Sequence, residues 1–180
     1  MKFTESQLEL AFIELLEQQG IPHVHGGNID RSEKEVLIKD DLKAFLLKQY
    51  EVDNLTESEA EKIIRQLETY SSSDLYESNK SIMKLLSDGF ALKREDNNQK
   101  DIWIYLIDYS KKDNNNYKIV NQLEITGFQK RIPDGIVYIN GLPLVVFEFK
   151  SAIRENTTIH NAYTQLTTRY KRDIPELFKF

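Results

Sequence analysis

The chain has 180 residues, with 40% hydrophobic and 29% charged residues, no cysteine and a net charge of −5 at pH 7. The lack of cysteine excludes disulfide frameworks, iron–sulfur clusters, thiolate zinc sites and thiol nucleophiles, and it suits a reducing compartment. No apolar run approaches the roughly 20 residues of a membrane span, and no signal-peptide pattern opens the chain. We therefore expect a single domain in the cytoplasm, without membrane association.

The acidity of the chain is unevenly distributed. Residues 126–180 hold eight Lys and Arg against five Asp and Glu, a net charge of +3, so residues 1–125 carry −8. The overall charge argues against a generally basic nucleic-acid-binding protein. It does not exclude a local basic surface in the last third.

Residues 1–90 have the periodicity of helices. Capping-box patterns at Thr4, Ser32 and Thr56, each with Glu or Gln three residues later, precede apolar stripes and predict three helix starts. A fourth helix is expected over residues 78–86, ended by Gly89. The sequence thus predicts a helical region over residues 30–90 in addition to the first helix.

The period changes after residue 100. Residues 101–109, 117–125, 132–139 and 144–149 are rich in aromatic and β-branched residues and predict strands. Asn140-Gly141 between the last two predicts a hairpin. Residues 159–172 return to a helical period. We expect mostly antiparallel strands followed by a helix.

Two charged residues interrupt the last strand. Because strand side chains alternate between faces, Glu148 and Lys150 point to one side while Phe147 and Phe149 point to the other. If the hairpin has a three-residue loop about Gly141, Asp134 faces Glu148, and two carboxylates and an ammonium share one patch. With a two-residue loop the register slips by one residue and the patch is lost.

Such a patch predicts a magnesium site. Two carboxylates close together repel each other unless a cation lies between them, and Mg²⁺ takes one or two carboxylates, waters and phosphate oxygens. We assign Asp134, Glu148 and the backbone carbonyl of Phe149 as ligands, and Lys150 to orienting the attacking water and neutralising the transition state. The alternative is a surface ion pair between Glu148 and Lys150.

These residues also carry a family resemblance. RIPDGIVYI, NGLP followed by LVVFEFKSA, and QLTTRYKRDIPELF resemble the N-terminal nuclease domain of the restriction (R) subunit of type I restriction-modification enzymes, a PD-(D/E)xK nuclease. The detailed match covers residues 120–180, and the opening TESQLELAFIELLEQQGIPHVHGG is similar to the family's first helix and turn. Residues 28–75 match only in being helical.

The resemblance implies Mg²⁺-dependent cleavage of double-stranded DNA, with Asp134, Glu148 and Lys150 on the motif positions. It also implies partners, the modification and specificity subunits, and an ATP-driven motor downstream in the same polypeptide. No G-x-x-x-x-G-K-[ST] phosphate loop occurs in the chain, so ATP is expected only for the motor region that this chain lacks. We therefore expect the N-terminal piece of a larger subunit.

The family has a Gln-x-x-x-Tyr motif on the helix after the lysine strand, and the chain departs from it. Gln165 and Tyr170 are five residues apart, about 140° around an α-helix, so they are not expected to share a face. Gln165 aligns instead with Arg169 and Arg172, which could contact DNA phosphates or brace Lys150. The alternative is a solvated polar face, with Tyr170 in the core.

The first helix offers a further carboxylate. Glu9 lies at the edge of the apolar stripe and is the candidate for completing the metal site, although it could equally be a surface glutamate. His23 and His25 could suggest a metal pair, but a turn before Gly26-Gly27 is the better interpretation.

Two basic pairs are further candidates. Lys130-Arg131 and Lys93-Arg94 could contact phosphates or could simply be surface charge.

The sequence thus predicts an α/β protein with a PD-(D/E)xK (restriction-endonuclease-like) core over residues 100–180, a central mixed, mainly antiparallel sheet flanked by helices, and a helical insertion over residues 30–90. The expected function is Mg²⁺-dependent endonucleolytic cleavage of double-stranded DNA by a type I restriction enzyme. One alternative is a recombination or repair nuclease of the same superfamily. The other is a non-catalytic DNA-positioning or subunit-docking module.

Overall fold

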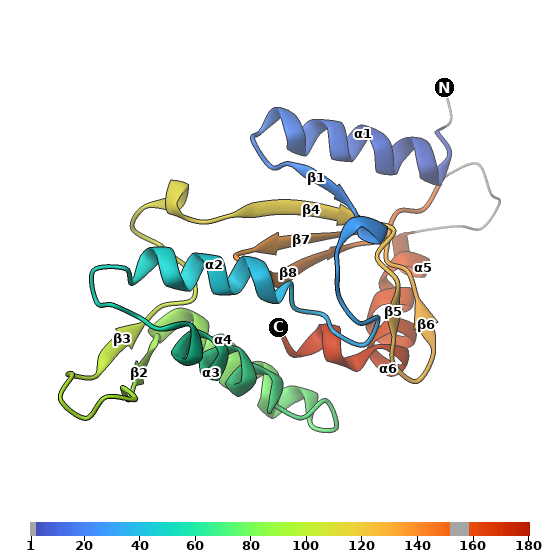
Figure 1. Ribbon diagram of the computed structural model, residues 1–180. Coiled ribbons are helices and arrows are strands. Elements are labelled where there is room, and N and C mark those ends of the chain that lie inside the picture. Colours follow the sequence, from blue (N-terminus) through green and yellow to red (C-terminus); the bar gives the residue numbers. More distant parts are fainter. Residues whose placement is uncertain (1–2, 152–158) are drawn as a thin grey trace. The chain divides into compact units, whose positions relative to one another are not determined.

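The computed structural model describes residues 3–151 and 159–180 (Figure 1). Contacts divide these residues into two compact units. The first unit lies within residues 1–36, 117–138 and 143–177, and the second comprises residues 37–116, 139–142 and 178–180. Both are α/β in content, so each is described separately.

A four-stranded sheet in the order β1-β4-β7-β8 forms the centre of the first unit. Its strands are β1 (His23–His25), β4 (Tyr117–Asn121), β7 (Gly135–Ile139) and β8 (Leu142–Phe147). β1 runs parallel to β4, with His23 opposite Ile119 and His25 opposite Asn121.

The other strands run antiparallel to their neighbours, so the sheet is mixed. Asn116, just before β4, accepts a hydrogen bond from the backbone N–H of Asn140, just after β7, and donates its own N–H to the Asn140 side chain, both at 2.7 Å. β4 and β7 therefore run in opposite directions, so Asn121, at the end of β4, lies beside the start of β7.

Helices flank this sheet. The N-terminal helix α1 (Glu5–Gln18) packs Ile13 against Ile119 of β4 and Val137 of β7. The C-terminal helical segment consists of α5 (Ile159–Thr164), the π-helix η3 (Gln165–Tyr170) and α6 (Lys171–Asp173), followed by the 3₁₀ turn η4 (Pro175–Lys179). A small hairpin of β5 (Ile125–Thr126) and β6 (Lys130–Arg131) leads from β4 toward β7.

The second unit is mainly helical. It contains α2 (Lys39–Gln49), α3 (Glu57–Glu68) and α4 (Leu75–Asp88), with the two-stranded ribbon of β2 (Phe90–Leu92) and β3 (Ile102–Ile104). Its core side chains include Leu42, Ile63 and Ile82, which are fully buried. Two short 3₁₀ turns complete the described elements: η1 (Gly26–Asn28) in the first unit and η2 (Lys112–Asn114) in the second.

The helix predictions are confirmed except at two starts: α4 begins at Leu75, after its cap Asp74, rather than at Ser78, and no helix begins at Ser32. Thr4 and Thr56 form complete capping boxes with Gln7 and Glu59, and Gly89 ends α4 in a left-handed conformation at φ 70°. The start predicted at Ser32 is wrong, because α2 begins only at Lys39. Residues 36–38 are three consecutive buried apolar residues, Val, Leu and Ile, and the N–H of Ile38 donates to the carbonyl of Gly141 instead of continuing a helix.

The strand predictions are confirmed in position but not in length. Of residues 101–109 only β3 forms a strand, because the Asp108 carboxylate accepts hydrogen bonds from the N–H groups of Ser110 and Lys111 and turns the chain. The strand predicted over residues 117–125 is divided into β4 and β5. Within the described ranges, none of the helices has both the length and the apolar composition that crossing a bilayer requires.

Candidate active site

The β7–β8 hairpin positions the predicted motif residues. Its loop is the two-residue turn Asn140-Gly141, with φ angles of 52° and 79°, typical of a type I′ turn. Glycine is required here because a Cβ at Gly141 would lie 2.2 Å from the carbonyl oxygen of Ile38. Of the two loop lengths considered from the sequence, the structure thus has the shorter one.

A two-residue loop was expected to separate Asp134 from Glu148, and this expectation is wrong. β8 ends at Phe147, so the strict alternation of strand side chains does not extend to Glu148 and Lys150. The chain beyond β8 turns its backbone toward Asp134, and the N–H of Phe149 donates to the Asp134 carboxylate at 2.6 Å. The two carboxylates therefore lie close enough to interact electrostatically.

Lys150 completes the cluster. Its Nζ forms an ion pair with Oε1 of Glu148 and donates to the carbonyl oxygen of Phe149 at 3.0 Å. The side chains of Glu148 and Lys150 are only 2% and 16% exposed, so this is not a surface ion pair on a solvated strand edge. The structure brings Asp134, Glu148 and Lys150 together.

The electrostatics of the cluster are unfavourable for Asp134. Partial burial, together with the charges of Glu148 and Glu9, raises the pKa of the carboxyl to about 6, against the opposing effects of the Phe149 N–H and Lys150. The cluster contains more negative charge than Lys150 balances. A site of this kind favours a bound cation.

Tyr170 and Gln165 support Glu148 from the C-terminal helical segment. The Tyr170 hydroxyl donates to Oε2 of Glu148 at 3.0 Å, and Nε2 of Gln165 donates to the Tyr170 hydroxyl at 2.9 Å. Burial raises the pKa of this hydroxyl above its usual value, so it is a neutral donor at physiological pH. Gln165 therefore reaches Glu148 through Tyr170.

The prediction that Gln165 and Tyr170 do not share a face is wrong. Residues 165–170 form a π-helix, in which the hydrogen-bonding interval is five residues rather than four. The wider helical turn accommodates the one extra residue, so Tyr170 comes to lie on the same side of the helix as Gln165. Arg169 is exposed on this helix, and its alignment with Gln165 stays a prediction. Tyr170 is buried, as predicted, but its hydroxyl faces Glu148.

Glu9 is the third carboxylate near the cluster. Its Oε1 accepts hydrogen bonds from Nδ2 of Asn121 at 2.8 Å and from Nε2 of Gln122 at 3.3 Å. One turn further along α1, the ring of Phe12 packs on Phe147 and Phe149 with centroid separations of 4.4 and 5.4 Å. α1 is thereby anchored to the segment that carries Glu148.

The candidate DNA contacts are mostly engaged within the protein. Lys130 pairs with Glu33 and Glu124. Arg131 and Arg172 both pair with the buried carboxylate of Asp173. Arg169 is exposed on the π-helix.

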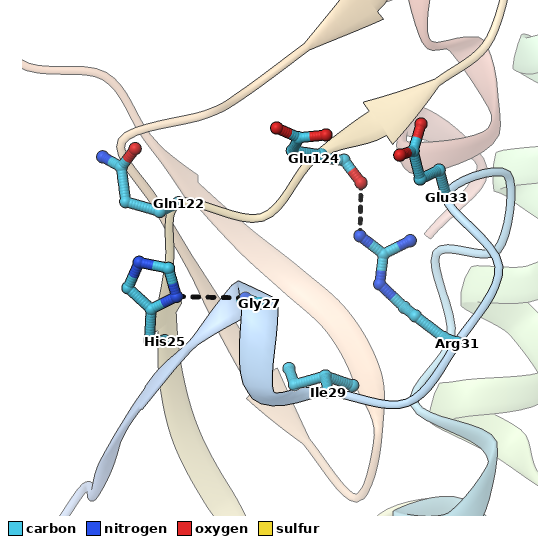
Figure 2. A pocket seen from close by; sticks show the side chains of 8 residues that line it. His25, Gly27, Ile29, Arg31, Glu33, Gln122 and Glu124 are labelled. Carbon is cyan, nitrogen blue, oxygen red and sulfur yellow. Dashed lines mark hydrogen bonds between the residues drawn. The ribbon is translucent and has the colours of Figure 1, made fainter.

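His23 and His25 do not point to a common metal. Nδ1 of His25 accepts the N–H of Gly27 at 3.1 Å and caps the turn η1, which confirms the turn interpretation. His25 and Gln122 line one side of a pocket of about 250 Å³, with Arg31, Glu33 and Glu124 on the other side (Figure 2). Nε2 of His23 lies 2.8 Å from Oδ1 of Asn121.

Sequence reasoning missed Asn121, Gln122 and the contact of Tyr170 with Glu148. The available signal was the pair of amides that closes the apolar strand β4, because two uncharged polar residues at a strand end are candidates for a site at that edge. Nothing in the sequence shows that residues 165–170 form a π-helix.

Comparison with known proteins gives the family. The family model described as Type I restriction enzyme R protein N terminus matches residues 2–180. The chain belongs to this family, and the resemblance seen in the sequence is confirmed.

Individual relatives support the same family. The chain is 39% identical over 129 residues to the Type I restriction enzyme HindI endonuclease subunit of Haemophilus influenzae, covering 70% of this chain and 12% of the relative. It is 30% identical over 182 residues to the Putative type I restriction enzyme MjaIXP endonuclease subunit of Methanocaldococcus jannaschii, covering 96% and 17%. A Staphylococcus saprophyticus endonuclease subunit is 26% identical over 181 residues, covering 98% and 18%. The chain thus spans 12 to 18% of the length of these relatives.

Proposed function

We propose that the chain is a Mg²⁺-dependent endonuclease domain with a PD-(D/E)xK core, which cleaves double-stranded DNA as part of a type I restriction enzyme. The observation that carries this proposal is the convergence of Asp134, Glu148 and Lys150 in a chain whose relatives are named as endonuclease subunits. Two carboxylates and a lysine on neighbouring segments, in a family of restriction subunits, are best explained by phosphodiester hydrolysis.

The donors present fit a magnesium ion. Among the described residues, no three His, Asp or Glu side chains are grouped to hold a metal by themselves. Mg²⁺ needs only one or two carboxylates and retains several waters, so Asp134, Glu148 and the carbonyl of Phe149 would suffice. Each carboxylate oxygen of Glu148 accepts one hydrogen bond and keeps a second lone pair. When bound, the ion would supply positive charge beside the scissile phosphate.

The protein groups have distinct roles in this proposal. Tyr170 fixes the orientation of Glu148, and the N–H of Phe149 fixes that of Asp134. Lys150, bonded to Glu148 and to the carbonyl of Phe149, keeps its ammonium beside both groups. There it can hold the attacking water and offset negative charge that develops on the phosphate.

The partners follow from the same proposal. We expect the domain to act on double-stranded DNA in a complex with modification and specificity subunits, with an ATP-driven motor elsewhere in the full-length protein. Lys130, Arg131 and Arg172, three of the candidate DNA contacts, are already in ion pairs, which suits a nuclease whose DNA affinity comes from its partners.

A non-catalytic docking module is the alternative. It is favoured by the fact that both oxygens of Glu148 already have partners, Lys150 and Tyr170, as in a purely structural network.

Plasmid cleavage distinguishes the two functions. The full-length protein with its partner subunits, ATP and Mg²⁺ is compared with its Glu148→Gln variant and with Glu14→Gln, an exposed residue of α1. We expect Glu148→Gln to lose at least about 100-fold in cleavage rate, with ATP hydrolysis retained, and Glu14→Gln to match the parent. Undiminished cutting by Glu148→Gln would defeat the nuclease assignment and leave the docking module.

A further inference from the structure

The end of β4 holds the Glu9 carboxylate with two consecutive side-chain amides. Asn121 is 7% exposed, and its amide lies between His23 and Glu9 at 2.8 Å from each. Since Nδ2 donates to Glu9, Oδ1 is left to accept from His23, and the two contacts fix the orientation of the amide. Gln122 adds a second donor to the same oxygen of Glu9 at 3.3 Å.

The backbone of Gln122 is in an unfavourable conformation. Its φ is 50°, in the left-handed region that glycine, asparagine and aspartate tolerate better than glutamine. The surrounding packing holds it there, because Leu123 is fully buried and a Cβ on the neighbouring Gly26 would lie 2.5 Å from the Leu123 Cα. Strain of this kind costs of order 1 to 3 kcal/mol and tends to occur at functional sites.

The strained residue lies at the sheet edge that carries the candidate active site. β4 and β7 are antiparallel neighbours, so Asn121 and Gln122 lie beside the start of β7, where Asp134 immediately precedes Gly135. Glu9 comes to the same edge from α1, whose Phe12 is packed on Phe147 and Phe149. Glu9 is close enough for its charge to act on Asp134, and the two amides hold it in this position.

We propose that Asn121 and Gln122 are positioning residues that hold the Glu9 carboxylate near Asp134, where its negative charge strengthens the binding of a metal ion to Asp134 and Glu148. This inference rests on the proposed function. The hydrogen bonds orient Glu9 and offset part of its charge in the metal-free protein. They also keep the carboxylate from turning into solvent, where a helix-surface glutamate would otherwise point. Outer-shell groups around a metal site typically change metal affinity by 10- to 100-fold when removed.

Gln122→Gly separates positioning from a structural role. Glycine relieves the left-handed backbone, so a purely structural role predicts equal or higher stability and unchanged metal binding. We expect Mn²⁺ binding to the nucleotide-free, DNA-free full-length protein, measured by electron paramagnetic resonance, to weaken about 10-fold, while the melting temperature is unchanged or higher. Asn54→Gly is the matched control, because Asn54 is exposed with φ 53° and belongs to the second unit. It should leave Mn²⁺ affinity unchanged.

A double-mutant cycle identifies Glu9 as the group acted on. In a Glu9→Gln background, Gln122→Gly should weaken Mn²⁺ binding no further, since the charge that it positions is already gone. Suppose that the parent binds Mn²⁺ in an Asp134-dependent way. The positioning role is then overturned if Gln122→Gly binds Mn²⁺ within twofold of the parent, or if the losses of affinity from Gln122→Gly and Glu9→Gln add fully in the double variant. The proposed function stands in both cases. If the parent shows no Asp134-dependent binding, the proposed function falls and takes this inference with it.

Discussion

Asp134 bears an electrostatic cost that can be measured directly. Its pKa is about 6 in the folded protein against an ordinary aspartate value of 3.8, so the folded state binds the proton more tightly than the unfolded state. Ionised Asp134 therefore destabilises the fold above pH 6, and this cost disappears as the pH falls from 6 through 3.8.

Replacing the carboxylate by an amide should therefore stabilise the metal-free protein. We expect Asp134→Asn to raise the melting temperature in EDTA at pH 7.5 by about 2 to 4 °C, and to have almost no effect near pH 3, below both pKa values, where the parent carboxyl is mostly protonated in both states. Differential scanning fluorimetry at the two pH values measures this, with Glu14→Gln as the control. A fall in melting temperature at pH 7.5 would mean that the Asp134 carboxylate is structurally paired.

Some residues of the candidate active site could be predicted from the sequence and others could not. Asp134, Glu148 and Lys150 could be predicted because an apolar strand rarely carries an acid and a base two residues apart without reason. Their approach across a two-residue turn could not, because it depends on the chain leaving the strand after Phe147. The amides at the end of β4 mark Asn121 as a candidate, but its contact with Glu9 could not be predicted, since it depends on where α1 packs.

The π-helix is the element whose removal is most informative. If its only function is to absorb one extra residue between Gln165 and Tyr170, deleting the exposed Thr168 should convert it to a regular α-helix and keep the pair on one face. We expect this deletion to retain cleavage within about threefold of the parent, whereas Gln165→Ala should lose about 10-fold, as is usual for groups that orient a metal ligand. Circular dichroism checks that the deletion variant is folded.

The reverse outcome would show that the π-helix is required in itself. If the Thr168 deletion is folded but as inactive as Gln165→Ala, the extra residue serves a purpose other than spacing.

At the scale of elements, local hydrogen bonding decided which predictions succeeded. Capping boxes at Thr4 and Thr56 begin helices, because the residues that follow them continue an amphipathic pattern. The same pattern at Ser32 does not, because the three apolar residues after Glu35 are buried outside any helix. A one-residue insertion in a helix leaves no local signal, so the π-helix was not predictable.

For the whole molecule, the ion pairs that engage basic side chains predict DNA binding that is weak and depends little on salt. With a net charge of −5, and with Lys130, Arg131 and Arg172 in ion pairs, we expect only about one to three phosphate contacts and a slope of log K against log salt of about −1 to −3. Fluorescence anisotropy of a labelled duplex with the 180-residue chain measures the slope. The double variant Glu33→Gln/Glu124→Gln should steepen it by up to about one unit, because it removes both ion pairs of Lys130.

A parent slope of −6 or steeper would contradict this expectation. It would indicate a basic surface that the ion pairs do not neutralise.

The most direct measurement is the position of a metal ion in crystals of the protein soaked in Mn²⁺, located by anomalous diffraction. We predict a peak in contact with the carboxylates of Asp134 and Glu148, absent from Asp134→Asn crystals treated in the same way. A parent map with no peak at these carboxylates under saturating Mn²⁺, or one in which the two side chains point apart, would contradict the assignment of a metal-dependent nuclease.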